Sequence, residues 1–216
     1  HSSAIRPTNM EMAKCLMEIA KNDNENIQIR KTAVASLAVF ATNLDEAANF
    51  LEQIATPNYE TVVGTEAIYG LCKMLPEQCH FINPVLNQLK ADTLPTNSIE
   101  GMFAEKLISA VTSSRPDILQ QLITIYETDG FSNETRLVIT KGLANAAPNP
   151  TIIAFLESVL MNADKCYDCP EVASQALVRM APESIANIDF LISDLNSENH
   201  GYRWYDSDFI LSLIHI

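Results

Sequence analysis

The chain has 216 residues, of which 47% are hydrophobic, and its 27 acidic and 14 basic residues give a formal net charge of −13. This composition predicts a folded chain with a sizeable core, and its acidic balance argues against nucleic acid as a partner, because the phosphate backbone attracts basic surfaces. The sequence contains no apolar run of the roughly 18 residues that a membrane-spanning helix needs, so we expect no membrane insertion.

Two alternating series of leucines run along the chain. The first recurs at intervals of 35, 35, 36, 34 and 35 residues, at Leu16, Leu51, Leu86, Leu122, Leu156 and Leu191. The second consists of Leu37, Leu71, Leu107, Leu143 and Leu177. A fixed period of this size is typical of helical repeats, in which each unit buries its apolar face against its neighbours. We therefore expect an all-α fold, an α-solenoid of about six antiparallel helix pairs.

The expected repeats follow one another in chain order. They cover residues 8–41, 44–75, 77–113, 115–147, 149–181 and 183–210. Helix starts are indicated by Asn83-Pro84 in the third, Ser114 with Asp117 in the fourth and Asn149-Pro150 in the fifth. We interpret residues 1–210 as a single repeat domain from a longer protein. Residues 211–216 read as a tail derived from a sequencing adaptor.

One stretch carries a family resemblance. Residues 16–37 read LMEIAKNDNENIQIRKTAVASL, with an apolar first helix, an Asp in the turn and an Arg opening the second helix. This pattern resembles a HEAT repeat, in which Asp23 and Arg30 match the family's conserved Asp and Arg, and Asp129 and Arg136 repeat the spacing. The resemblance implies a right-handed superhelix with a hydrogen-bonded Asp–Arg ladder between adjacent turns. The ladder is expected to be interrupted where other residues take the Arg position, at Gly64, Glu100 and Pro170.

The exposed face of the second helix in each pair is the candidate binding surface. Positions two before and two after each leucine of the second series lie four apart and so share one face of a helix. In HEAT solenoids this face lines the concave side. The candidate residues are Tyr69, Lys73, Glu105, Lys141, Asn145, Gln175 and Arg179. We expect the basic members to meet acidic or phosphorylated groups of a protein or peptide partner, with Tyr69 as an anchor; the alternative is the ordinary solvated face of an amphipathic helix.

The function expected from these features is that of a non-enzymatic scaffold or adaptor. The sequence contains no G-x-S-x-G, H-E-x-x-H or glycine-rich phosphate loop, so we predict no catalytic residue and no cofactor. The alternative, drawn from the resemblance alone, is an accessory HEAT-like domain of an enzyme, either the C-terminal domain of a zinc aminopeptidase or a bilin-lyase-like protein.

The cysteines and an aromatic run leave alternatives open. Cys166 and Cys169 have the spacing of half a zinc site, and Cys79 with His80 could supply two further ligands, but the two pairs fall on opposite edges of the expected fold, so we predict no metal. Free thiols in the cytoplasm are the favoured interpretation, with a local disulfide as the alternative for an exported protein. The run 200–205 is either an aromatic recognition patch or a helix face that has lost its packing partner.

Overall fold

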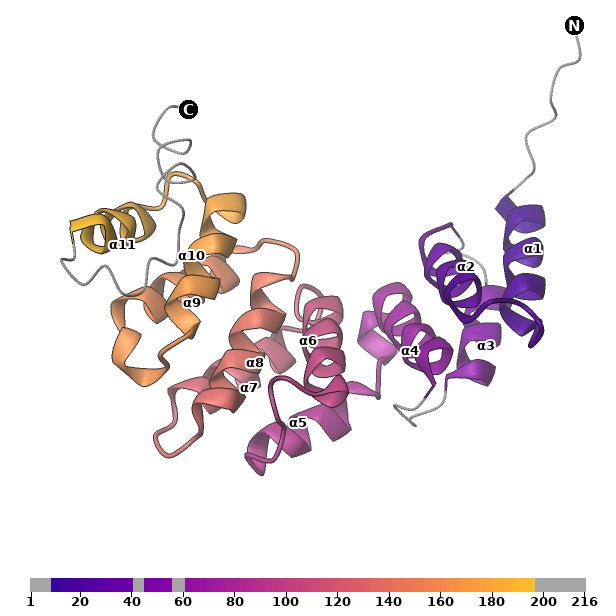
Figure 1. Ribbon diagram of the computed structural model, residues 1–216, viewed down its shortest axis with the longest axis horizontal. Coiled ribbons are helices and arrows are strands. Elements are labelled where there is room, and N and C mark those ends of the chain that lie inside the picture. The colour runs from indigo at the N-terminus through magenta and orange to yellow at the C-terminus, as the bar shows by residue number, and fades with distance from the viewer. Residues whose placement is uncertain (1–8, 41–44, 56–60, 197–216) are drawn as a thin grey trace, which may run out of the picture.

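The computed structural model describes residues 9–40, 45–55 and 61–196, and within these ranges the chain is all-α, with eleven α-helices and no strand (Figure 1). The first six helices are α1 (Asn9–Lys21), α2 (Ile27–Phe40), α3 (Asp45–Ile54), α4 (Val62–Met74), α5 (Ile82–Lys90) and α6 (Ile99–Val111). The remaining five are α7 (Pro116–Glu127), α8 (Asn133–Ala144), α9 (Pro150–Met161), α10 (Cys169–Met180) and α11 (Ile185–Asn196). Two short 3₁₀ helices, Pro76–Gln78 and Ala163–Lys165, lie between them.

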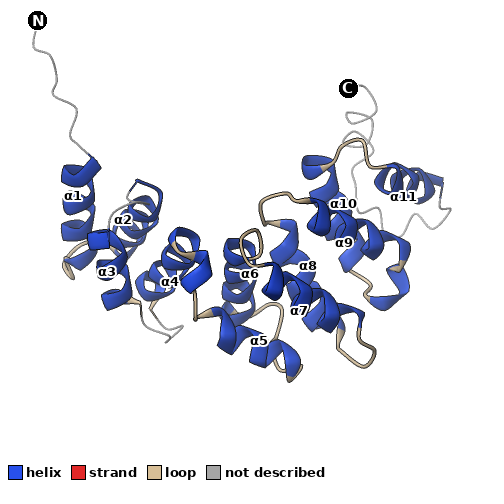
Figure 2. Cartoon of the chain, turned by 180° about the vertical axis from the view of Figure 1, so that it is seen from behind, coloured by secondary structure: helices blue, strands red, loops and turns tan. Residues whose placement is uncertain are grey.

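The helices pack on their neighbours in chain order. Each even-numbered helix also packs on the next even-numbered one, α2 on α4, α4 on α6, α6 on α8 and α8 on α10. The described helices form an arc, and α2, α4, α6, α8 and α10 lie along its inner side; we call these five helices the inner row (Figure 1). The view from behind shows the same succession of helices joined by loops (Figure 2). This sequential packing is consistent with a helical repeat.

Both series of leucines point into the core. All five leucines of the second series are buried, and in the first series Leu51, Leu86, Leu122, Leu156 and Leu191 are buried while Leu16 is half-buried. The buried residues form two clusters that meet at α4, since Val63 and Ala67 belong to the cluster of the first helices whereas Ile68 and Cys72 belong to the other. The periodic apolar positions therefore supply the core that holds successive helices together.

Glycine permits the closest approaches within the inner row. A Cβ added to Gly70 on α4 would lie 2.9 Å from the Cβ of Ala38 on α2, and one added to Gly142 on α8 would lie 2.6 Å from Cγ2 of Ile108 on α6. Both distances are shorter than normal contacts between carbon atoms. The absence of a side chain at these positions therefore sets how closely adjacent inner helices pack.

Of the three helix starts expected from the sequence, one is observed as expected and two have a different first or capping residue. Asn149 caps α9 as expected, since its side chain accepts a hydrogen bond from the Ile152 amide at 2.9 Å. By contrast, α5 begins at Ile82, before Asn83 and Pro84, and the residue preceding α7 is Arg115 rather than Ser114. Arg115 binds Asp117 through two hydrogen bonds of 2.8 and 2.7 Å, so the carboxylate expected to serve a capping box is used by the guanidinium instead.

Some expectations fall outside the described residues. The second helix of the range 183–210, the aromatic run 200–205 and the tail 211–216 are among them. Of the sixth expected pair, the structure describes α11 alone. Among the described helices, none combines the length and apolar character that crossing a membrane requires.

Candidate interaction surface

The predicted binding residues lie on the inner row or directly at its end. Six of them are on α4, α6, α8 and α10, and Asn145 caps the C-terminal end of α8; each is exposed or half-buried, while the leucine two positions away is buried: Tyr69, Lys73, Glu105, Lys141, Asn145, Gln175 and Arg179. The structure thus brings these side chains to one surface of the arc. Their contacts divide this surface into three parts, which the inner row carries in order from α2 to α10.

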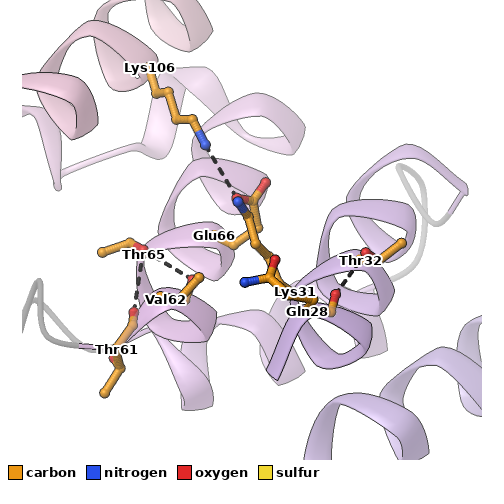
Figure 3. Close-up of polar contacts among 8 residues, drawn as sticks. All are labelled: Gln28, Lys31, Thr32, Thr61, Val62, Thr65, Glu66 and Lys106. Carbon is orange, nitrogen blue, oxygen red and sulfur yellow. Dashed lines mark hydrogen bonds and ion pairs between the residues drawn. The ribbon is translucent and has the colours of Figure 1, made fainter. Parts of the chain in front are cut away.

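The first part is centred on Glu66 of α4, which is only 7% exposed. Lys31 reaches its Oε2 from α2 at 3.9 Å, and Lys106 reaches the same oxygen from α6 at 3.4 Å (Figure 3). A buried carboxylate needs compensating charge, because water no longer solvates it. Glu66, on α4, therefore joins a lysine of α2 to a lysine of α6, so that three successive inner helices are linked.

The residues predicted from the sequence did not include Lys31, Glu66 and Lys106, because none of them lies two positions before or after a leucine of the second series. One signal was nevertheless present. Glu66 is the single charged residue in the apolar stretch from Val62 to Cys72. A charged residue within such a stretch is expected to be buried and paired.

Tyr69 lies between two ammonium groups. The Nζ of Lys73, one turn further along α4, lies 5.9 Å from the centre of the Tyr69 ring, and the Nζ of Lys106 lies 5.6 Å from it. These distances allow cation–π attraction of about 0.5–1 kcal/mol each at a partly exposed site. Lys106 thus contacts both Glu66 and Tyr69, and together with Lys73 it gives this part of the surface a positive character.

The second part joins α6 to α8 through Glu105 and Lys141, whose Oε1 and Nζ lie 3.8 Å apart. Burial raises the pKa of the Glu105 carboxyl above its ordinary value, and the nearby Lys141 charge opposes this effect without cancelling it. Both side chains are half-buried, but the Glu105 Oε1 that faces Lys141 is itself buried, so Lys141 is the more accessible member of the pair.

The third part lies at the α8–α10 end. The Arg179 guanidinium donates to the Ala144 carbonyl of α8 at 3.3 Å and to the Gln175 carbonyl at 3.4 Å. The Gln175 amide donates to Glu171 at 3.0 Å, and the Asn145 amide donates to the Lys141 carbonyl at 3.0 Å. These side chains are exposed polar groups held against their own or the adjacent helix.

The Asp and Arg of the expected ladder make different contacts in the first and in the fourth expected helix pair. In the first pair, Arg30 and Asp23 form an ion pair of 2.8 Å, and the Arg30 Nε donates to the Ala20 carbonyl at 3.0 Å. Both contacts lie within the turn between α1 and α2. The described residues show this pair joined within one turn, not between adjacent turns.

Arg136 makes its hydrogen bonds to carbonyls, with none to the exposed Asp129 among the described residues. It donates to the Tyr126, Thr128 and Phe131 carbonyls at 3.0, 2.9 and 2.8 Å. A further bond of 3.1 Å goes to the Lys165 carbonyl in the next turn. Arg136 is only 7% exposed, so its fixed fork of donors satisfies several carbonyls at once and ties two turns together.

Asp92 provides a second link between turns, which the sequence analysis did not anticipate. Its carboxylate accepts from the Ser132 hydroxyl at 2.6 Å and from the Ser132 amide at 3.1 Å. Burial raises the pKa of this carboxyl, but the hydrogen bonds from Ser132 and the charge of Arg136 outweigh that effect, so the pKa lies below its ordinary value. Asp92 adopts a positive φ of 53°, which an Asp side chain tolerates better than most.

The cysteines correct the expectation of free thiols. Cys72 is bonded to Cys79, with their Cα atoms 4.8 Å apart, and Cys166 is bonded to Cys169, with Cα atoms 5.4 Å apart. Cys72 lies in the last turn of α4 and Cys79 follows the 3₁₀ helix Pro76–Gln78, so this bond spans the end of α4. Cys15 is free and exposed.

Comparison of the chain with protein-family models, with curated proteins and with solved structures found no match. The surface described above is therefore interpreted from its own residues.

Proposed function

We propose that the chain is a HEAT-like α-solenoid, wound as a right-handed superhelix, and that it acts as a non-enzymatic scaffold that binds another protein or peptide along the inner row. The observation that carries this proposal is the division of the inner helices into two faces. Their leucines are buried between neighbouring helices, whereas their polar and aromatic side chains, among them Tyr69 and Lys73, remain accessible. A row of stacked helices with such a face offers an extended surface to a partner.

The contacts between inner helices support a preformed surface. Glu66 joins α2, α4 and α6, Glu105 joins α6 and α8, and Arg179 joins α10 to α8. These contacts already order the side chains in the free chain, so binding a partner would cost less side-chain conformational entropy. Tyr69, half-buried between lysines, is of the residue type enriched at the energetic centre of interfaces.

Site-specific photocrosslinking in cells of the native source tests this proposal. A photoreactive amino acid is placed at Asn145 or Gln175, which are exposed on the inner row, and in matched variants at Gln120 or Ala154, which are exposed on α7 and α9. We expect an adduct of one discrete mass from the inner positions only. Adducts from α7 and α9 alone, or none from any position, would contradict a scaffold that binds through its inner row.

Charge reversal provides the accompanying control. Lys73→Glu with Arg179→Glu should remove the adduct formed from Asn145, while circular dichroism shows unchanged helix content. An adduct that survives both reversals would show that the basic residues of the inner row play no part in recognition.

A further inference from the structure

Three lysines gather around Glu66 and Tyr69 on the inner row. We call these five residues the Glu66 cluster: Lys31, Glu66, Tyr69, Lys73 and Lys106. Glu66, Tyr69 and Lys73 share one face of α4, and Lys31 reaches this face from α2 and Lys106 from α6 (Figure 3). Because Lys31 and Lys106 approach the same Oε2 of Glu66, at 3.9 and 3.4 Å, their ammonium groups lie at most about 7 Å apart. The cluster therefore brings cations from separate helices close together.

The Glu66 cluster carries more positive charge than Glu66 can neutralise. Its three ammonium groups and one carboxylate leave a net charge of +2, in a chain whose overall net charge is −13. Glu105, which precedes Lys106, faces Lys141 at 3.8 Å, so that pair adds no net charge to the cluster. The Glu66 side chain is 8% exposed, whereas those of Lys31 and Lys106 are 36% and 47% exposed. The excess positive charge therefore lies where a ligand can meet it.

The ammonium groups of the cluster keep hydrogen-bond donors for a ligand. A lysine ammonium has three N–H donors. Among the described residues, the three lysines of the cluster make a single hydrogen bond, from Lys106 to Glu66 at 3.4 Å. Glu66 holds the Lys31 and Lys106 side chains near each other before a ligand arrives, so binding costs less of their conformational freedom. The cluster is therefore partly ordered to receive an anion.

A single phosphate group matches the charge and the dimensions of the cluster. A phosphorylated side chain carries a charge of about −1.5 to −2 at neutral pH, close to the opposite of the excess on the cluster, whereas Asp or Glu carries a single charge. Two oxygens of one phosphate, each accepting a charge-assisted hydrogen bond of about 2.8 Å, can bridge ammonium groups about 7 Å apart. Nucleic acid is disfavoured, because the chain as a whole is acidic and repels a long row of phosphates.

We propose that the Glu66 cluster binds a phosphoserine or phosphothreonine of a partner protein, with the phosphate held between Lys31 and Lys106. This inference rests on the proposed role of the inner row as a docking surface and adds the chemistry of the residue that it recognises. Because these lysines are accessible, the short side chain of a phosphorylated serine or threonine reaches them. Lys73 adds attraction beside Tyr69, and the half-buried Tyr69 ring offers an apolar contact to a neighbouring residue of the partner.

Fluorescence anisotropy with labelled peptides tests the proposal on the full chain. The probe is a Gly-Ser peptide that contains one phosphoserine, and its controls are the same peptide with serine or with glutamate at that position. We expect the phosphopeptide to bind about fivefold more tightly than the glutamate peptide, because its phosphate meets two ammonium groups with twice the charge. The serine peptide should not bind, and the affinity of the phosphopeptide should fall as salt is raised.

Four variants separate the cluster from the general charge of the chain. Lys31→Gln and Lys106→Gln each remove one contact to the phosphate but leave Glu66 one ion pair, so the chain should stay folded and binding should weaken about fivefold. Lys73→Gln keeps both ion pairs of Glu66 and should weaken binding about twofold. Lys14→Gln, at an exposed position of α1, should leave binding unchanged. Circular dichroism verifies the helix content of each variant.

Three results would overturn the proposal. The first is no binding of the phosphopeptide, or an affinity equal to that of the glutamate peptide. The second is phosphopeptide binding that Lys73→Gln and the folded Lys31→Gln and Lys106→Gln variants leave unchanged. The third is tighter binding of a single-stranded oligothymidine of equal net charge. If any of these occurs while photocrosslinks still form from Asn145 and Gln175 alone, the scaffold function stands and only the nature of its ligand is rejected.

Discussion

The guanidinium of Arg136 donates a hydrogen bond of 3.1 Å to the carbonyl of Lys165, and this bond ties the first turn of α8 to the 3₁₀ helix Ala163–Lys165 before α10. In the opposite direction, the Lys165 ammonium donates at 3.1 Å to the carbonyl of Glu127, the last residue of α7. The α7–α8 pair and the connection before α10 therefore exchange hydrogen bonds. Because turns expose carbonyls that no helix satisfies, such exchange holds successive helix pairs in register.

Removing the Arg136 side chain should destabilise the chain strongly. Arg136→Ala leaves four carbonyls without this donor, one at a buried and three at part-buried sites, which we expect to cost about 3 kcal/mol in the free energy of unfolding. Arg30→Ala is the matched control, because Arg30 is partly exposed and donates to a single carbonyl, and it should cost about 1 kcal/mol. Urea denaturation measures both, and equal losses would contradict the special role of Arg136.

The Asp92 carboxylate should make stability depend on pH. Its pKa is lowered in the folded chain, so its ionised form contributes stability above the unfolded-state pKa of about 3.9, and that contribution is lost as pH falls through the folded-state pKa. Asp92→Asn should lower stability by about 1 kcal/mol at neutral pH, and the difference from the original chain should shrink in acid. Asn also tolerates the positive φ at this position.

Thermal unfolding of the Asp92→Asn variant between neutral and acidic pH measures this effect. Asp129→Asn serves as its control, since this carboxylate lies in the following turn and is not a partner of Arg136 in the described structure. A constant difference in stability at every pH would show that the Asp92–Ser132 contact does not depend on the charge.

The close approach of α6 and α8 predicts an unusual response to alanine. Glycine to alanine within a helix normally stabilises it by about 1 kcal/mol. At Gly142 the added Cβ would meet Ile108, so we expect Gly142→Ala to destabilise the chain by about 1–3 kcal/mol. Urea denaturation showing a gain in stability would mean that the two helices are further apart than described.

The disulfides predict a specific pattern of alkylation. In denaturant without reductant, iodoacetamide should modify Cys15 alone, and after reduction it should modify all five cysteines. Denaturant removes protection by burial, so any remaining protection reports a bond. Mass spectrometry that finds Cys166 or Cys169 modified before reduction would contradict it.

The sequence predicted the helices better than it predicted the contacts between them. The leucine series identified the buried face of each helix, because a period near 35 residues reflects a packing requirement repeated in every unit. It also placed the stripe from Tyr69 to Arg179 on one surface. Glu66 and Asp92 escaped prediction because their partners lie on other helix pairs, which leaves no period in the sequence.

The aspartate of the fourth repeat shows a further limit of pattern alone. The spacing of Asp129 and Arg136 matches that of Asp23 and Arg30, yet Arg136 binds carbonyls while Arg30 binds its Asp. The difference follows from burial, since Arg136 is enclosed by the following turn, which offers the Lys165 carbonyl. Equal spacing therefore does not fix the partner of a side chain.

The most direct test of the inner row as a binding surface is an NMR titration of the ¹⁵N-labelled full chain with the partner recovered by photocrosslinking from Asn145 and Gln175. The account predicts that the largest shifts fall in α2, α4, α6, α8 and α10, around Lys31, Tyr69 and Lys106, while α3, α5 and α7 remain unchanged. Shifts concentrated on α3, α5 and α7, or no shifts at saturating partner, would contradict it.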